Sequence, residues 1–441
     1  MGAAGAIGAV SSGVLLTPVN PAAIALRVPW SQTWFDWELD AGITFPSSVT
    51  GLDFDNNGDD GYSNRTALFF TLGGGIQLGH LGFGLTLDYQ EYDLESRSES
   101  GIGVDARVIR VLVPVAYSWL EGELTTGIAL GINSIDLVRA DEVEAPISSV
   151  TGPSLHAGAV WAPAYAPLRV GLATRLSLPA SAQPDARPAC NPPQCVQAGD
   201  DFISDGFFLP RTVSLPNEVR LGFAYQFFKP LNFAWTNPKT DRPLRDQAVR
   251  RIERQRKERM ATRERALAEA SAAGGDIEAV RRRHDAIDRK ARAEEHQQLD
   301  EAVDDDLERR EAVYESLPRP RLLVALNLTA TLATTDGVGL ESFLEQTVER
   351  SGERLTIQPH AAAETEAWPG YVTVRAGTYL EPTRFRAGSD RWHGTGGLDI
   401  HIPLAWSIFG LLDDDTTYKL TGAIDGSQRY LGWNVGVGLW H

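Results

Sequence analysis

The stretch that decides the fold runs from Trp34 to Phe45 and reads WFDWELDAGITF. Its apolar side chains occupy every second position, at Phe35, Trp37, Leu39, Ala41, Ile43 and Phe45. The intervening positions include the acidic residues Asp36, Glu38 and Asp40. Successive side chains of a β-strand point to opposite faces. The stretch therefore predicts a strand with one apolar and one polar face.

The same alternation recurs along most of the chain. Clear examples are residues 83–90, 109–119, 170–178, 218–227, 397–404 and 431–439. Most such runs exceed the ~5–6 residues of soluble strands, whereas a tilted strand that crosses a bilayer needs about 9–11. Trp and Tyr gather near the ends, as membrane interfaces require. Because backbone groups in lipid must pair within the protein, we expect the strands to close into a barrel. The alternative is a large soluble β-sandwich.

The predicted fold is an antiparallel transmembrane β-barrel of about 14 strands. The expected strands are 32–46, 65–78, 82–91, 106–120, 123–136, 153–163, 168–179, 212–228, 320–334, 355–366, 370–381, 391–405, 417–424 and 429–441. An even count returns the C-terminus to the periplasmic side, where outer-membrane barrels have short turns. The predicted organisation is a plug at 1–31, barrel strands at 32–229 and 319–441, and an insertion at 230–318.

A charged helical block at 241–316 interrupts the strands. It contains 18 Lys plus Arg and 20 Asp plus Glu. Its start is basic, its end (294–315) is acidic, and Gly274-Gly275 lies between them. These charges favour an antiparallel helical hairpin, although an exposed ion pair contributes only ~0–1 kcal/mol. The hairpin follows an even number of strands, so we expect it in the periplasm, either as a solvated spacer or as a docking arm for a periplasmic protein.

The composition excludes several classes of protein. The net charge of −17 argues against a nucleic-acid binder, which needs a basic face. Two Cys in 441 residues exclude a disulfide-rich scaffold. The uncharged stretch 2–26 is broken by Pro18 and Pro21 and lacks the basic start of a secretory signal. We expect the signal peptide to have been removed from this chain.

Three short motifs carry a family resemblance. They are the small-residue start with Asn20-Pro21-Ala22, the stretch LPNEVRLGFAY at 215–225, and VRAGTYLEP at 374–382. In this order and spacing they resemble the long-chain fatty-acid outer-membrane transporters, the FadL-like family that includes the toluene porins. The resemblance covers barrel and plug and leaves out the helical insertion.

The resemblance implies a 14-stranded barrel whose N-terminal plug, with the motif Asn20, Pro21 and Ala22, lies in the lumen. It implies passive uptake of small hydrophobic molecules, such as long-chain fatty acids, hydrocarbons or lipids, across the outer membrane of a Gram-negative bacterium. The expected partners are a hydrophobic ligand and outer-membrane lipid, with no nucleic acid. The alternative function is a structural or secretion-associated barrel that transports nothing and whose hairpin docks a partner protein.

Six charged residues are expected to face the lumen: Asp36, Glu38, Asp40, Arg110, Arg175 and Arg220. Two roles remain open for them. They could form an ionic network that fixes the plug to the wall, or one Arg could pair with a carboxylate ligand.

Two loop features add further expectations. Asp53, Asp55, Asn57 and Asp59 match the first half of a calcium loop, although Asn64 stands where the bidentate Glu belongs. The alternatives are a Ca²⁺ site and a solvated acidic loop; no other cofactor is expected. Cys190 and Cys195 lie in one long outer loop, and we expect them to form a disulfide.

The sequence indicates no enzyme. It contains no nucleophile elbow, HExxH zinc motif, phosphate-binding loop or dinucleotide fingerprint. The alternative would be a catalytic site assembled from distant strands.

Overall fold

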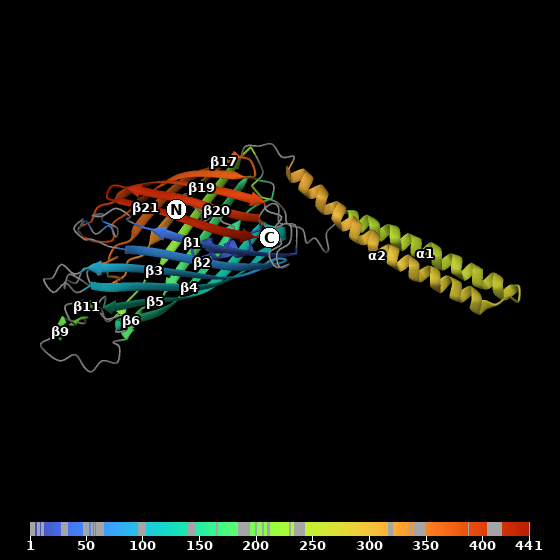
Figure 1. Cartoon of the computed structure of the whole chain (residues 1–441), viewed down its shortest axis with the longest axis horizontal. Helices are drawn as coiled ribbons and strands as arrows, with labels where there is room; N and C mark the ends of the chain where they lie inside the picture. The colour runs from blue at the N-terminus through green and yellow to red at the C-terminus, as the bar shows by residue number, and fades with distance from the viewer. Residues whose placement is uncertain are drawn as a thin grey trace. The chain divides into compact units, whose positions relative to one another are not determined.

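A computed structural model gives the fold of the chain (Figure 1). The structure describes residues 5–6, 9, 13–27, 34–46, 53, 56, 58, 66–95, 103–139, 146–164, 166–183, 195–198, 201–204, 207–209, 212–228, 231–232, 243–315, 321–335, 337–338, 350–386, 388–403 and 417–440. Contacts divide the chain into two compact units. One comprises Met1–Val28, Phe35–Ala234 and Pro318–His441, and the other Pro29–Trp34 with Trp235–Leu317.

Fourteen antiparallel strands close into a barrel, as predicted. They are β1 (Phe35–Phe45), β2 (Thr66–Leu78), β3 (Leu81–Glu95), β4 (Gly103–Trp119), β5 (Leu124–Arg139), β6 (Pro146–Trp161), β7 (Leu168–Ser177), β13 (Glu218–Phe227), β14 (Leu322–Thr331), β17 (Thr356–Trp368), β18 (Val372–Glu381), β19 (Arg391–Pro403), β20 (Thr417–Ser427) and β21 (Tyr430–Trp440). Each pairs with its neighbours along the chain, and β1 pairs with β21 from Glu38↔Trp440 to Phe45↔Trp433. The closed ladder leaves no edge strand in the barrel.

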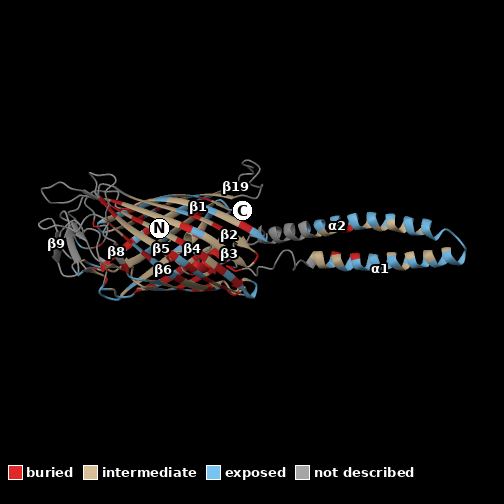
Figure 2. Ribbon diagram, turned by 90° about the horizontal axis from the view of Figure 1, so that it is seen from below, coloured by how far each residue is buried: buried red, intermediate tan, exposed pale blue. Residues whose placement is uncertain are grey.

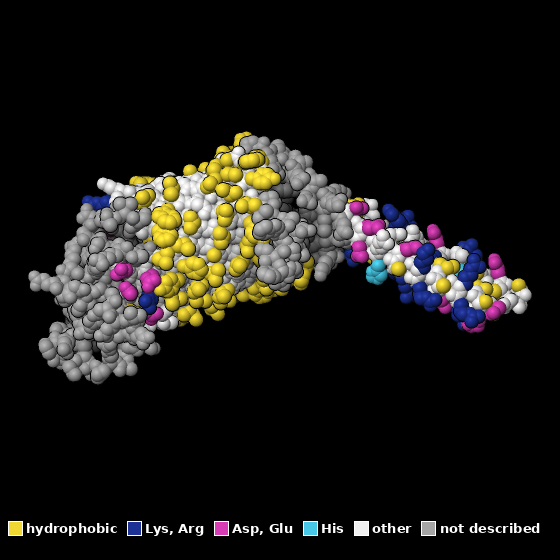
Figure 3. Space-filling view, in the orientation of Figure 1, with side chains coloured by type: hydrophobic (Ala, Val, Ile, Leu, Met, Phe, Trp, Pro, Cys, Tyr) yellow, Lys and Arg dark blue, Asp and Glu magenta, His cyan; other side chains and the backbone are white. Residues whose placement is uncertain are grey.

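The outward face of the barrel is apolar. On β5, Ile128, Leu130 and Ile132 are 57–68% exposed, while Ala129 between them is buried. Figure 3 shows hydrophobic side chains spread over the described wall of the barrel. The alternation read from the sequence therefore separates an apolar exterior from a polar interior, which is the arrangement that a surrounding lipid phase requires.

The two ends of the barrel differ in their connections. At one end the connections β2–β3, β4–β5, β6–β7 and β17–β18 are short, the second being the 3-10 turn η3 (Leu120–Gly122). The connection β19–β20 at the same end is longer and spans 404–416. At the other end most connections are long, with the turn at Gln428 and Arg429 as a short exception. The helical insertion follows β13 at the short-turn end.

The expected strand 212–228 differs from the structure. Pro216 lies between β12 (Thr212–Val213) and β13, and Pro cannot donate a ladder hydrogen bond. The preceding outer segment also contains the short strands β8 (Ala180–Gln183), β9 (Cys195–Ala198), β10 (Asp201–Ser204) and β11 (Phe207–Leu209), where the sequence predicts only a loop. A further two-stranded sheet pairs β15 (Gly337–Val338) with β16 (Arg350–Ser351).

The helical unit is an antiparallel hairpin of α1 (Pro243–Ala272) and α2 (Ile277–Glu315). Its seam contains few apolar residues, with Ala248 and Ile252 buried, so ion pairs carry much of the contact. Glu295 is 3% exposed and pairs with Arg256 and Arg259 of the other helix (Figure 2 shows the mostly exposed hairpin). None of the described helices is long and apolar enough to cross a membrane.

Candidate functional site: the plug and the lumen wall

The N-terminal segment forms two 3-10 turns, η1 (Val14–Leu16) and η2 (Pro21–Ala25). The Asn20 side chain accepts a hydrogen bond from the Ala22 amide (3.1 Å), and Pro21 supplies the fixed backbone angle of the first position. Asn20, Pro21 and Ala22 are all buried. The predicted plug motif therefore forms the capped start of a compact turn.

Glycines on the inner wall make room for this turn. A Cβ at Gly127 of β5 would lie 2.7 Å from the Ala22 nitrogen, and Cβ atoms at Gly82 and Gly158 would collide with Ile24 and Asn20. Gly127 alternates with the exposed Ile128, so it faces the lumen. The plug therefore packs directly on the backbone of β3, β5 and β6. Sequence reasoning missed this surface, although its signal was present as glycines at the polar phase of alternating strands.

Polar contacts hold the plug to the wall. Arg27 forms an ion pair with Asp36 of β1 and donates to the Gly79 carbonyl (2.9 Å). The Asn20 amide donates to the Ala159 carbonyl (3.3 Å), and Gln77 donates to the Ile24 carbonyl (2.9 Å). Among the predicted lumen residues, Asp36 thus anchors one end of the plug.

Glu38 and Asp40 continue the acidic row of β1. A Cβ at Gly13 of the plug would lie 3.2 Å from a Glu38 carboxylate oxygen, so this side chain lies against the plug. Asp40 is 6% exposed and lies 3.5 Å from the Lys419 ammonium of β20. These two carboxylates face the same lumen from one strand and differ in what they contact.

The three predicted arginines come from β4, β7 and β13. Arg175 and Arg220 each lie 2.6 Å from a different oxygen of Glu218. Arg220 also donates to the Pro18 carbonyl of the plug (2.9 Å), and Arg110 donates to Gln90 (3.3 Å). Arg220 therefore contributes to plug anchoring, whereas Arg110 and Arg175 form no hydrogen bond with the described residues of the plug.

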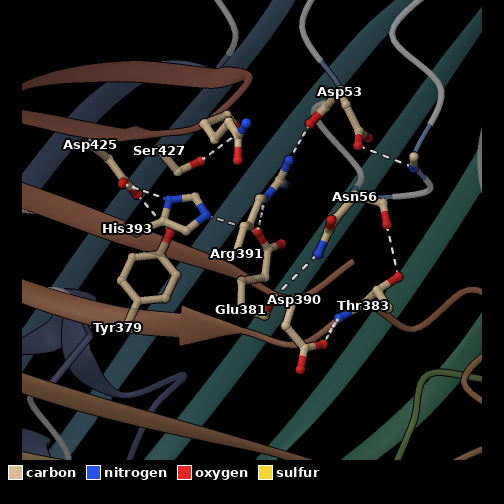
Figure 4. A network of polar contacts seen from close by, with 12 residues as sticks. Asp53, Asn56, Tyr379, Glu381, Thr383, Asp390, Arg391, His393, Asp425 and Ser427 are labelled. Atoms are coloured by element: carbon tan, nitrogen blue, oxygen red, sulfur yellow. Dashed lines mark hydrogen bonds and ion pairs between the residues drawn. The ribbon is translucent and has the colours of Figure 1, made fainter. Parts of the chain in front are cut away.

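A polar network lies at the long-loop end of β18, β19 and β20 (Figure 4). The two ring nitrogens of His393 lie 2.9 Å from Asp425 and 2.9 Å from Glu381, and the Tyr379 hydroxyl donates to Asp425 (2.7 Å). Arg391 donates to Glu381 and to the Asp53 carbonyl. A Ser–His–Asp relay needs a hydroxyl on the second His nitrogen. Here that nitrogen faces the Glu381 carboxylate, so the network lacks the geometry of such a relay. Through Arg391 the network connects Asp53 to the rim of the barrel.

The calcium and disulfide predictions fall largely outside the described residues. Asp53 is described; one of its carboxylate oxygens accepts the Gly58 amide (3.1 Å). Asp55, Asn57 and Asp59 lie outside the described residues, and the part of the chain that is described contains no group of three or more metal-ligating side chains. Cys190 also lies outside, while Cys195 begins β9 and its side chain is not described. Both remain predictions.

Comparison with known proteins finds likeness in three dimensions only. No family model and no curated protein matches the chain. Among solved structures, a Pseudomonas aeruginosa FadL homologue is similar with a TM-score of 0.49 at 11% identity, covering 100% of this chain and 98% of its own. The P. putida toluene transporter TodX has a TM-score of 0.46 at 12% identity, with 100% and 98% covered.

The Ralstonia pickettii toluene transporter TbuX has a TM-score of 0.44 at 11% identity, with 100% and 97% covered. The family that the sequence motifs resemble is thus represented among the structural neighbours. The fold of this chain is established by its own strand pairing, and these likenesses assign it no substrate.

Proposed function

We propose that this chain is an outer-membrane channel for the passive uptake of small hydrophobic molecules, such as long-chain fatty acids, hydrocarbons or lipids. The observation that carries the proposal is the neutral plug turn fitted onto a glycine-lined inner wall of a closed barrel. A plug stops water and ions from leaking through the lumen. An apolar solute gains about 25 cal/mol for each Å² that it removes from water, so it is favoured beside an apolar turn.

An interruption in the barrel ladder supports a lateral route to the bilayer. The pairing of β3 with β4 runs from Glu95↔Gly103 to Thr86↔Leu112 and resumes at Phe83↔Val115, skipping Gly84 and Leu85. The residue opposite Gly84 in this register is Pro114, which cannot donate a ladder hydrogen bond. On the lumen side, a Cβ at Gly84 would lie 3.0 Å from Ile24 of the plug. This interruption of the β3–β4 ladder therefore borders the plug.

We propose that the helical hairpin lies in the periplasm. It is inserted at the short-turn end of the barrel, which is the periplasmic end in outer-membrane barrels. A docking arm for a periplasmic protein is the second candidate role for this chain, favoured by two helices whose described side chains are mostly exposed. In that case the hairpin, rather than the lumen, would carry the function.

A reversible cross-link tests the lateral route. In a Cys190→Ser/Cys195→Ser background, Leu85→Cys/Val113→Cys places thiols on the two exposed positions that face each other at the interruption. Oxidation should lower the uptake of a labelled fatty acid into proteoliposomes, and a reductant should restore it. Leu87→Cys/Val111→Cys, the next pair on the same face of the intact ladder, is the matched control and should transport normally in both states. Native uptake by the oxidised first pair would refute the lateral route.

A further inference from the structure

Three arginines, Arg175, Arg220 and Arg384, interact with the carboxylate of Glu218 in the lumen, and a fourth, Arg110, lies near enough to Arg175 to interact electrostatically with it. Arg110, Arg175 and Arg220 face inward from β4, β7 and β13. Arg384, just after β18, lies near enough to Glu218 and Arg175 to interact electrostatically with both. Glu218 pairs with Arg175 and Arg220 at 2.6 Å each, so its two oxygens are already used.

Some of the hydrogen-bond donors of these arginines have no acceptor among the described residues. The Nε atoms of Arg110 and Arg175 are buried and meet no acceptor among the described residues. Arg110 makes one long bond, to the neutral Gln90 (3.3 Å), and Asp88 opposite it across the ladder forms no ion pair with it within the described structure. Burial lowers the pKa of Arg384, whose electrostatic partner Glu218 opposes that shift. A buried polar group without a partner costs about 1–3 kcal/mol.

The charge imbalance indicates the kind of ligand that would relieve it. Among the described residues, the four guanidinium groups share one carboxylate, Glu218, which leaves an excess of three positive charges. If Asp88, opposite Arg110 in the ladder, is also counted, the excess is two. A single carboxylate on a ligand would leave at least one positive charge unmatched. A phosphate monoester carries about −1.5 to −2 at neutral pH and offers three acceptor oxygens. Guanidinium groups bind phosphate through paired hydrogen bonds.

We propose that Arg110, Arg175, Arg220 and Arg384 form the head-group site for an amphiphile that ends in a phosphate monoester. The inference rests on the proposed channel function and narrows its cargo. Arg220 also donates to the Pro18 carbonyl, so the head group binds beside the plug. The apolar tail of the ligand distinguishes this cargo from inorganic phosphate, which has the same head-group chemistry.

Binding to the full chain in detergent tests the inference with four probes. Dodecyl phosphate has a doubly charged head group, and dodecanoate has a singly charged one. Dodecanol tests the tail without a charge, and inorganic phosphate tests the free ion without a tail. At pH 8 dodecyl phosphate should bind at least 10-fold more tightly than dodecanoate or inorganic phosphate. Arg110→Gln and Arg384→Gln should each weaken dodecyl phosphate binding by about 10- to 100-fold, the effect of losing a charge-assisted hydrogen bond, and leave dodecanol unchanged.

Two further readouts make the test specific. The preference for dodecyl phosphate should shrink below about pH 6, where the monoester keeps only one charge. Arg107→Gln on the outward phase of β4, 36% exposed at its side chain and paired with Glu91, is the matched control and should bind like the native chain. Heat-modifiable migration on gels reports whether each variant retains the folded barrel.

The outcomes separate the inference from the channel function. Equal affinity for dodecyl phosphate and dodecanoate, or full affinity in both Arg variants, would overturn the phosphate site while leaving fatty-acid uptake intact. Inorganic phosphate binding as tightly as dodecyl phosphate would also overturn it, because the site would then hold a free ion. If none of the tailed probes binds and no hydrophobic molecule is taken up, the channel function itself fails.

Discussion

Asn20→Ala should loosen the plug, because this side chain makes two of its contacts. Its oxygen caps the Ala22 amide at 3.1 Å, and its amide donates to the Ala159 carbonyl of β6 at 3.3 Å. Loss of the cap costs about 1 kcal/mol, and loss of a second hydrogen bond costs about as much. The total of about 2 kcal/mol corresponds to a roughly 30-fold larger population of displaced plug, since 1.4 kcal/mol is tenfold.

Single-channel recording in planar bilayers measures that population as the fraction of time in an ion-conducting state. Asn434→Ala is the matched control, because Asn434 donates to Ile43 (3.0 Å) and Thr44 (2.7 Å) and forms no hydrogen bond with the described residues of the plug. We expect a rise of about 30-fold for Asn20→Ala and none for the control. The reasoning is refuted if both variants conduct like the native chain, or if both conduct equally more.

Two further predictions concern the plug surface and the hairpin. Gly158→Val should displace the plug and raise ion conductance, because its Cβ would collide with Asn20. The control Gly422→Val should leave the conductance unchanged, because its Cβ would meet nothing within 4 Å. The same conductance in both variants would argue against the packing of the plug on the glycines of the wall. Glu295→Gln should destabilise the hairpin by about 1–2 kcal/mol, which is less than the value for a fully buried ion pair because Arg256 is half exposed. The control Glu294→Gln loses only a 3.7 Å surface contact with Lys290 and should not change the helical melting of the hairpin. The hydrogen bond from Arg256 lowers the pKa of Glu295, so the stabilisation is present above the usual Glu pKa of about 4.3 and is lost as pH falls through the lower folded-state value; a hairpin equally stable at pH 7 and pH 2, measured by circular dichroism, would contradict this.

The barrel could be predicted because the signal for each strand lies within its own segment of sequence. Each strand has one face toward lipid, so the period-2 pattern of segments such as 34–45 and 429–441 reports strand position and orientation directly. The break at Pro216 was missed because alternation continues through 212–228 while the backbone hydrogen bonds do not. The hairpin turn followed from the glycines at 274 and 275, and the structure leaves 273–276 between the two helices.

The site could be predicted only as a set of inward positions. Alternation indicates that Asp36, Arg175 and Arg220 face the lumen, but partners such as Arg27 and Glu218 depend on which strands the closed barrel brings together. The rim network joins Asp53 to Arg391, which are 338 positions apart in the chain. No local pattern encodes such a contact. The need for glycine at positions such as Gly127 becomes apparent only once the plug is known to pack against them.

The most direct test of the channel function is uptake of a labelled long-chain fatty acid into proteoliposomes that contain the purified chain. The matched variant replaces residues 243–315 with a short flexible linker and so removes both helices while keeping every barrel strand. We expect uptake above that of protein-free liposomes for both chains, at similar rates. Absence of uptake by the intact barrel would contradict it, and would favour a barrel whose periplasmic hairpin carries the function.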